Sequence, residues 1–340
     1  MSFKTEITKL HYNKKTLLCI FMPILSVCAF FYSIITKIRN YCYDNDIIKS
    51  QKVSVKVISV GNLTTGGVGK TPVVAEIARH YIKWKQKVAI ILRGYGGKLS
   101  NKDVHVVSLN GEILYTAEEI GDEPYWYAEN IPEAYVITCR DRVKAANYAI
   151  TKFAPDVIIL DDAFQHRKIK RDVDIVLVDS VKLFGNGKHL PAGPLREDLN
   201  GLKRADKLLV MNKSLKEVNT EDILSKLFDK NKISICNVVP SFTYNIKTTE
   251  ILPLKSDVVA VCAIGQPEQF YNFVQQKYNL LGVRTFDDHH IYKKEDLSDI
   301  KCNIITTEKD AVKLEKFGFE NIYALKLKLD LNIEEVLKNV

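Results

Sequence analysis

The stretch VISVGNLTTGGVGKTP, residues 57–72, decides the fold of this chain. It begins with an apolar run typical of a buried strand, and residues 72–84 repeat apolar side chains at helical spacing. Between the two lies a glycine-rich turn that ends in Gly69, Lys70 and Thr71. Backbone amides in such a turn can surround a polyphosphate, the lysine can reach its outer oxygens, and the threonine hydroxyl can ligate Mg²⁺. The sequence therefore predicts a phosphate-binding loop and the use of a nucleoside triphosphate.

This loop departs from the strict phosphate-loop pattern at one position, because Thr64 stands where glycine is required. A glycine-rich turn of an ordinary α/β protein is the alternative, and the strand-turn-helix setting disfavours it. Pro72 fits a first helical turn, where a missing N–H costs nothing. We expect the nucleotide to be bound by Asn62, Thr64, Thr65, Gly66, Gly67, Val68, Gly69, Lys70 and Thr71.

Apolar strands and amphipathic helices alternate after the loop, which predicts βαβ units and a parallel sheet covered on both faces. The strands are expected at 87–93, 104–109, 134–139, 156–162, 174–179 and 207–212, with helices at 122–129 and 142–152.

Short strands with two prolines are expected at 235–255, where the chain crosses into a second, smaller α/β lobe. That lobe is predicted to contain strands at 257–265, 303–307 and 322–329 and helices at 267–278 and 310–317. We therefore divide the chain into an N-terminal membrane-anchor segment (1–50), a phosphate-loop core (51–240) and a C-terminal lobe (241–340). Two lobes joined by a hinge suit an enzyme that closes over its substrate.

The composition is that of a globular protein long enough for two packed domains: 340 residues, 46% hydrophobic and 26% charged. Seven cysteines are scattered singly and form no C-x-x-C pair, so neither a zinc site nor a disulfide framework is indicated. A reducing compartment is the natural interpretation.

The N-terminal segment combines positive charge with an apolar run. The chain has a net charge of +8, and seven of its lysines and arginines stand against three acids within residues 1–50. Residues 17–35 carry no charge, and as a helix they would be roughly 28 Å long, close to the thickness of a bilayer core. Flanking lysines suit anionic head groups.

Several interpretations compete for this run. A cleaved signal peptide lacks its A-x-A site, and a single span would send the catalytic domain outward by the positive-inside rule. We favour a monotopic or re-entrant anchor, bent at Pro23, that keeps both flanks on the cytoplasmic side. A buried core helix of a soluble protein is the remaining alternative.

Paired carboxylates, Asp161 and Asp162, follow a strand whose carboxyl end should lie at the ligand-binding edge of the sheet. One of them would hold Mg²⁺ beside Thr71. An acid that caps a loop is the structural alternative. Asp122, at a predicted helix start, is open to two interpretations: a helix N-cap, or a general base that accepts a hydroxyl proton.

Residues 286–290, FDDHH, join acids and histidines. Adjacent histidines on a strand point to opposite faces, which disfavours one metal ion, so one histidine paired with a carboxylate is more plausible chemistry, and a surface loop is the alternative. The residues Met211, Asn212 and Lys213 are similar to a guanine-reading motif, but Leu215 replaces its aspartate. Candidates for phosphate contacts are Arg93, Arg140, Arg142 and Arg196.

Together, in this order, nine segments resemble the tetraacyldisaccharide 4'-kinase family of lipid A biosynthesis. They are PILS (23–26), KIRNYCY (37–43), GNLTTGGVGKTP (61–72), LRGYGG (92–97), GDEP (121–124), DDAFQH (161–166), PAGPLRE (191–197), FDDHH (286–290) and TTEKDAVK (306–313). The phosphate loop with Thr64 and Pro72 is similar to the family's own variant. One departure is Ala163, where the family more usually has glycine.

The resemblance implies that ATP phosphorylates the 4'-hydroxyl of a tetraacylated glucosamine disaccharide 1-phosphate at the cytoplasmic face of the inner membrane. It implies a P-loop NTPase-type α/β core, ATP and Mg²⁺ as cofactors, a membrane-lipid environment, and neither nucleic acid nor an obligate protein partner. The implied roles are phosphate and Mg²⁺ binding by Lys70 and Thr71, metal-side acids at Asp161, Asp162 and Glu197, and a base at Asp122 assisted by His289 rather than His290.

Three rival functions remain: a membrane-associated partitioning-type ATPase, a signalling GTPase and a nucleotide-binding scaffold. The ATPase would share the loop and the bilayer contact but would hydrolyse ATP without an acceptor. Acceptor-dependent loss of the γ-phosphate separates the kinase from all three.

Overall fold

The computed structural model describes residues 3–12, 16–213, 221–264, 267–287 and 290–338. The chain divides into two compact units, the first comprising Met1–Cys236 with Leu331–Val340 and the second Asn237–Asp330. The C-terminal end therefore clusters with the first unit, whereas the sequence analysis placed all of 241–340 in one lobe. The reason is a short helix, α10 (Ile333–Leu337), which contacts helix α3 of the first unit and buries Val336.

The first unit is built on a sheet with the strand order β8-β7-β1-β6-β2-β5-β3-β4. Strands β8 to β5 in this order run parallel, as predicted, while β3 and β4 add an antiparallel edge that the alternation of strands and helices did not reveal. The strands are β1 (Lys56–Asn62), β2 (Val88–Leu92), β3 (His105–Leu109), β4 (Glu112–Ile113), β5 (Tyr135–Thr138), β6 (Val157–Asp161), β7 (Val173–Asp179) and β8 (Lys207–Asn212).

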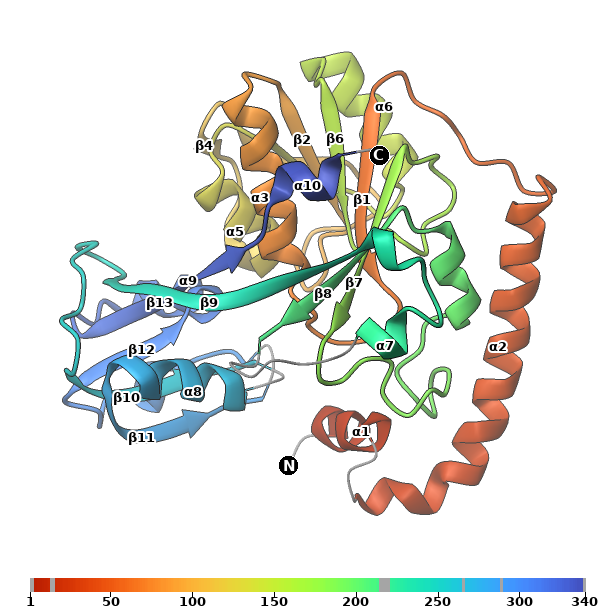
Figure 1. Cartoon of the computed structure of the whole chain (residues 1–340). Coiled ribbons are helices and arrows are strands. Elements are labelled where there is room, and N and C mark those ends of the chain that lie inside the picture. Colours follow the sequence, from red (N-terminus) through yellow and green to blue (C-terminus); the bar gives the residue numbers. More distant parts are fainter. Residues whose placement is uncertain (1–2, 13–15, 214–220, 265–266, 288–289, 339–340) are drawn as a thin grey trace. The chain divides into compact units, whose positions relative to one another are not determined.

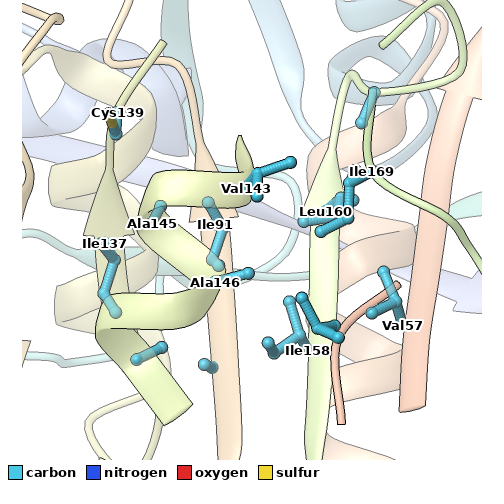
Figure 2. Packing of buried hydrophobic residues seen from close by; sticks show 14 residues of the cluster. Val57, Ile91, Ile137, Cys139, Val143, Ala145, Ala146, Ile158, Leu160 and Ile169 are labelled. Carbon is cyan, nitrogen blue, oxygen red and sulfur yellow. The ribbon is translucent and has the colours of Figure 1, made fainter. Parts of the chain in front are cut away.

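Helices cover this sheet, and its central strands are buried along their whole length. Figure 2 shows apolar side chains of helix α6 lying against those of strands β1, β2, β5 and β6, as the unbroken apolar strands predict. Each fully buried isoleucine or valine here contributes about 1.5–3 kcal/mol of transfer free energy. The helices are α3 (Lys70–Lys83), α4 (Ala117–Ile120), α5 (Asp122–Asn130), α6 (Arg142–Phe153) and α7 (Glu221–Leu224), with a 3₁₀ helix at Leu199–Arg204 and another at Lys230–Lys232.

In the second unit the strands follow the order β11-β10-β12-β13-β9. Its elements are β9 (Ile233–Asn245), β10 (Asp257–Cys262), α8 (Pro267–Lys277), β11 (Asn279–Thr285), β12 (Asn303–Thr307), α9 (Glu308–Leu314) and β13 (Ile322–Asp330), with 3₁₀ helices at Lys294–Asp296 and Glu315–Phe317. The prediction of only short strands at 235–255 is wrong, because β9 is a single 13-residue strand paired antiparallel with β13. Pro240 is tolerated there because it pairs with Leu327, where the register shifts.

The N-terminal segment forms helix α1 (Phe3–His11), a 3₁₀ turn (Leu17–Phe21) and the long helix α2 (Met22–Asp44), seen as one continuous helix in Figure 1. Pro23 lies in the first turn of α2, directly after the 3₁₀ turn, and the helix runs nine residues beyond Ile35. The expected bend at Pro23 stays a prediction. By length and composition the helix could cross a membrane, and only 11% of its most apolar window is buried. Such exposure disfavours a core helix of a soluble protein.

Candidate active site

The phosphate loop links the end of β1 to the start of α3. Gly66 and Gly69 have φ angles of +111° and +103°, a region that side-chain-bearing residues rarely adopt, and Gly69 directly precedes the helix. A Cβ at Gly66 or Gly67 would meet no atom within 4 Å, so the space beside the turn is open at both positions. The first amides of α3 have no partner within their own helix, which makes this end of the helix an anion-binding site.

Neighbouring segments hold the loop in shape. The PAGPLRE segment pairs with it, since Thr65 N donates to Pro194 O at 2.8 Å and Arg196 N donates to Leu63 O at 2.8 Å. On another side, Lys213 Nζ donates to Gly67 O at 2.9 Å. The turn is therefore fixed by hydrogen bonds before any ligand binds, which lowers the entropy cost of binding a polyphosphate.

Lys70, the first residue of α3, lies between two oxygen atoms. Its Nζ donates to Asn62 Oδ1 at 3.3 Å and lies 3.4 Å from Asp162 Oδ1. Asn62 is fully buried and also donates through Nδ2 to Thr64 O at 2.7 Å, so it is itself fixed. The ammonium group of Lys70 is thus held between Asn62 and Asp162, and its role in binding phosphate stays a prediction.

Asp161, the last residue of β6, is a buried carboxylate with one open oxygen. Tyr127 donates its hydroxyl to Asp161 Oδ2 at 2.9 Å, whereas Oδ1 accepts no hydrogen bond from the described residues. Burial, reinforced by the nearby charge of Glu123, raises the pKa of Asp161 to about 7. A buried acid with a raised pKa and an oxygen that accepts no hydrogen bond is typical of a site that binds a cation.

Asp162 differs from its neighbour in environment and in backbone. Its φ of +50° is left-handed, and its carboxylate contacts Arg196 NH1 at 2.7 Å as well as Lys70. Burial alone would raise the pKa of this carboxyl group, but the charges of Lys70 and Arg196 lower it to about 2. Asp162 therefore stays ionised at neutral pH. Left-handed backbone of this kind at a non-glycine residue is often found at functional sites.

These residues fit Mg²⁺ carried by a nucleotide. Tyr127 joins Thr71 to Asp161, because its hydroxyl also lies 3.3 Å from Thr71 O. Hydroxyl and carboxylate oxygens are the ligands that Mg²⁺ prefers, and one or two of them suffice when phosphate oxygens complete the shell. Within the described part of the chain, no three His, Cys, Asp or Glu side chains gather as a metal cluster.

Glu197 is buried elsewhere in the site. Its carboxylate accepts hydrogen bonds from Asn40 Nδ2 at 2.7 Å, Gln165 Nε2 at 3.1 Å and Arg204 NH2 at 2.7 Å, and no part of the residue is exposed. The described residues do not gather Glu197 with Asp161 and Asp162 into a metal cluster. Its role as a metal-side acid stays a prediction.

Asp122 does not cap its helix. Gly121 occupies the N-cap position, and Asp122 is the first residue of α5, so the interpretation of Asp122 as the N-cap is wrong. Gly121 is required there because its φ is +100° and a side chain would lie 2.6 Å from Tyr95 O. Asp122 itself is half-buried. Its role as a general base stays a prediction.

The FDDHH segment is described only in part, since Asp288 and His289 lie outside the described residues. The neighbouring His290 has Nε2 at 3.0 Å from Asp296 Oδ2, and its ring stacks on Phe286 with the ring centres 4.4 Å apart. These contacts give His290 a structural role. The choice of His289 as the assisting group stays a prediction.

The candidate arginines separate into two kinds. Arg142 is buried and donates to Cys139 O at 3.0 Å and Asp161 O at 3.3 Å, so it fixes the backbone on which Asp161 stands. Arg196 instead pairs with Asp162. Sequence reasoning missed Tyr127 and Lys213, and it missed Asn40 and Gln165 as partners of Glu197. No spacing signals these contacts, because each joins residues from different elements.

Comparison with known proteins adds an independent line of evidence. A family model described as LpxK, tetraacyldisaccharide-1-P 4'-kinase, matches residues 21–340. A protein named tetraacyldisaccharide 4'-kinase from Halothermothrix orenii is 33% identical, and the alignment covers 91% of this chain and 88% of that protein. A protein of the same name from Desulfotalea psychrophila is 37% identical, and the alignment covers 85% of this chain and 87% of that protein. A solved structure, "apo" form LpxK from Aquifex aeolicus in complex with ATP, superposes with a TM-score of 0.74 at 33% identity, covering 95% of this chain and 97% of that one.

Proposed function

Because this chain belongs to the tetraacyldisaccharide-1-P 4'-kinase family, we propose that it transfers the γ-phosphate of ATP to the 4'-hydroxyl of an acylated glucosamine disaccharide 1-phosphate. The predicted family, the α/β fold class with a phosphate-loop core, and the kinase activity with ATP are confirmed by the matches over most of the chain. The partitioning-type ATPase is not favoured. The observation that supports the proposal best is the open Asp161 oxygen beside the loop that holds Lys70.

Binding of the phosphates and of Mg²⁺ is assigned to the loop, Lys70 and the paired aspartates. The amides at the start of α3 bind the polyphosphate, and Lys70 moves from Asn62 and Asp162 onto its outer oxygens. Thr71, Asp161 and Asp162 would hold the Mg²⁺ that enters with ATP, and the ion supplies neutralisation of phosphate charge. Arg196 keeps Asp162 ionised and oriented.

The acceptor side falls to Asp122, assisted by His289. The Asp122 carboxylate accepts the proton of the 4'-hydroxyl while that oxygen bonds to the γ-phosphorus. The bond between the γ-phosphorus and the bridging oxygen breaks, and ADP leaves. Asp122 is the first residue of α5, and this assignment rests on the resemblance of the GDEP segment to the family.

Helix α2 is proposed to hold the enzyme at the cytoplasmic face of the inner membrane. Large apolar side chains cover its outer side, among them Ile24, Phe30, Phe31, Ile35 and Ile38, each more than half exposed. An acyl-chain substrate stays in the bilayer, so an enzyme at the interface meets the sugar head group without extracting the lipid. The kinase chemistry itself is assigned to the core within residues 51–240.

Transfer of label tests the proposed reaction. Detergent-solubilised protein is incubated with Mg²⁺ and γ-labelled ATP, with and without the acylated disaccharide 1-phosphate. We expect label to enter the lipid, and ADP to appear, only when the acceptor is present. Release of inorganic phosphate at the same rate without acceptor would overturn the proposal in favour of an ATPase.

Flotation with liposomes tests the anchor. Phe31→Lys combined with Ile35→Lys places two charges on the exposed side of α2 and should move the protein from the floating to the soluble fraction, because each charge must leave water to follow the helix into lipid. Ile251→Lys, at an exposed position of the second unit, is the matched control. Unchanged flotation of the double variant would show that other surfaces dominate.

A further inference from the structure

We propose that Tyr32 and Asn40 of helix α2 are positioning residues for phosphoryl transfer. Helix α2 is hydrogen-bonded through these two side chains to the segment 196–197, and two chains of contacts lead from that segment to Lys70. The inference rests on the proposed role of Lys70 in binding the phosphates of ATP. It assigns to the membrane-anchoring helix a second task, which is to hold the phosphate site in its working geometry.

The first chain of contacts runs through Arg196. The Tyr32 hydroxyl donates to Arg196 O at 2.9 Å, which fixes the backbone of this residue against the helix. The Arg196 guanidinium contacts Asp162 Oδ1 at 2.7 Å, and the same oxygen lies 3.4 Å from Lys70 Nζ. One hydroxyl of α2 is thus three contacts away from the ammonium that meets the phosphates.

The second chain runs through Glu197. Asn40 Nδ2 donates to Glu197 Oε2 at 2.7 Å, and Gln165 Nε2 donates both to Glu197 Oε1 at 3.1 Å and to Asn62 O at 2.9 Å. The side chain of Asn62 then accepts the hydrogen bond from Lys70. The two chains share no residue between α2 and Lys70, yet both end on the same ammonium group.

Burial makes the second chain sensitive to α2. Glu197 has no exposed surface, and beyond Gln165 its oxygens depend on Asn40 and Arg204. A buried carboxylate that loses a hydrogen-bond donor must move or bind another donor, because water cannot reach it to replace the lost hydrogen bond. The last turns of α2 are also fastened, since Arg167 NH1 donates to Asn40 O at 3.0 Å and Arg167 NH2 pairs with Asp44 at 2.7 Å.

The two sides of α2 therefore have different functions, one in membrane binding and one in support of the phosphate site. Ile24, Phe31 and Ile35 are exposed and apolar, whereas Ala29 and Thr36 are buried against the first unit on the side of the helix that carries the polar contacts. A displacement of the helix would be transmitted to Arg196 and Glu197 and from them to Lys70. Small displacements matter there, because a misplacement of about 1 Å at reacting groups can cost on the order of 100-fold in rate.

Two pairs of matched variants test this inference in the full-length protein. Asn40→Ala and Tyr32→Phe each remove a contact with the segment 196–197. Asn45→Ala is the control for the first, because among the described residues its side chain bonds to Tyr41 O of its own helix, and Tyr41→Phe, at an exposed position, is the control for the second. The readouts are kcat, the KM for the lipid acceptor and flotation with liposomes, all measured on protein whose thermal midpoint is recorded.

We expect kcat to fall about tenfold or more for Asn40→Ala and severalfold for Tyr32→Phe, with the KM for the lipid acceptor and flotation unchanged and both controls at wild-type values. Asn40→Asp should be worse than Asn40→Ala, since it sets a second negative charge against Glu197. A wild-type kcat for both test variants overturns the inference, and so does a loss of kcat that follows a loss of flotation. A wild-type protein that labels no lipid would instead overturn the proposed function. Tyr32→Phe removes a single hydroxyl, so its kcat tests the inference if Asn40→Ala does not fold.

Discussion

Two aspartates, one in each unit, follow buried parallel strands and have raised pKa values because of burial, yet their surroundings differ. In the second unit, Asp310 Oδ2 accepts hydrogen bonds from Ala263 N at 2.9 Å and from Thr307 Oγ1 at 2.8 Å, which fixes the start of α9. Each acid also keeps its Oδ1 without a hydrogen bond from the described residues, but in the first unit the other oxygen of Asp161 accepts from the Tyr127 hydroxyl, and the charge of Lys70 acts on the carboxylate. An acid engaged by a backbone amide and a capping hydroxyl is a structural element, whereas a buried acid beside a lysine-bearing phosphate loop is prepared for a ligand.

Lys70→Ala should have the largest effect, because it removes the ammonium group that is proposed to bind the phosphates of ATP. We expect transfer to fall by about 10³-fold, the scale of losing a major electrostatic contact to a transferring phosphoryl group, with the fold intact. Initial rates of lipid labelling measure the loss, and circular dichroism checks the fold. Lys52→Ala, at an exposed position, is the control. A rate within tenfold of wild type would remove Lys70 from the mechanism.

Substituting each of the two aspartates in turn tests the comparison directly. Asp161→Asn should lower transfer by about 100-fold or more without lowering the thermal midpoint, because the asparagine removes the metal-binding charge and a costly buried carboxylate. Asp310→Ala should instead destabilise the second unit by about 1–3 kcal/mol, because Ala263 N loses its partner. Thermal unfolding and initial rates are measured on both variants. The opposite result, a stability loss only at Asp161 and an activity loss only at Asp310, would invert the two assignments.

Binding of Mg²⁺ with nucleotide should depend on pH through Asp161. Its pKa of about 7 means that most molecules carry a protonated carboxyl group at pH 6 and an ionised one at pH 8. Since the ion binds only the ionised form, affinity should rise about tenfold over this interval.

The same group contributes to stability with the opposite trend. Its folded pKa lies above the unfolded value of about 3.9, so its contribution to the metal-free fold is complete below about pH 4 and is lost as the pH rises through 7. Calorimetric titrations and thermal melts at both pH values measure the two effects. In Asp161→Asn, the affinity for Mg²⁺ and the stability should both depend less on pH, apart from the pH dependence that comes from the ionisation of ATP itself. Unchanged pH profiles would contradict the assignment.

Tyr127→Phe should give the smallest effect. The variant removes the hydroxyl that donates to Asp161 Oδ2 and that lowers the pKa of this carboxyl group. Loss of that hydrogen bond should raise the pKa further and shift the rise in activity to higher pH, with a severalfold lower rate at pH 7. Tyr135→Phe is the control, because Tyr135 stacks on Phe153. An unshifted pH profile would show that Tyr127 does not tune Asp161.

The sequence predicted the local elements of this comparison well. Strand β6 and the acids after it, the loop before Lys70 and the start of α5 at Asp122 all lie where the apolar pattern and glycines placed them. Each depends on neighbours along the chain, where periodicity and turn chemistry act. The confirmed family resemblance added the activity, which no spacing alone supplies.

What the sequence did not predict depends on distant residues. Nothing near Asn40 or Glu197 indicates that they meet, because 157 positions separate them. In the same way the length of β9 depends on its pairing with β13, which outweighs the low strand propensity of Pro240. The return of α10 to the first unit depends on a surface of α3 that lies more than 200 residues earlier.

The hydrogen bonds from α2 to residues 196 and 197 bear on how this protein should be prepared for study. A truncation that begins after Asp44 would be attractive as a soluble reagent, but it would remove both of those contacts together with the apolar surface. Inhibitors selected on such a fragment would be selected against a phosphate site without its natural support. The intact chain in detergent or nanodiscs is therefore the appropriate reagent for screening compounds against the ATP site.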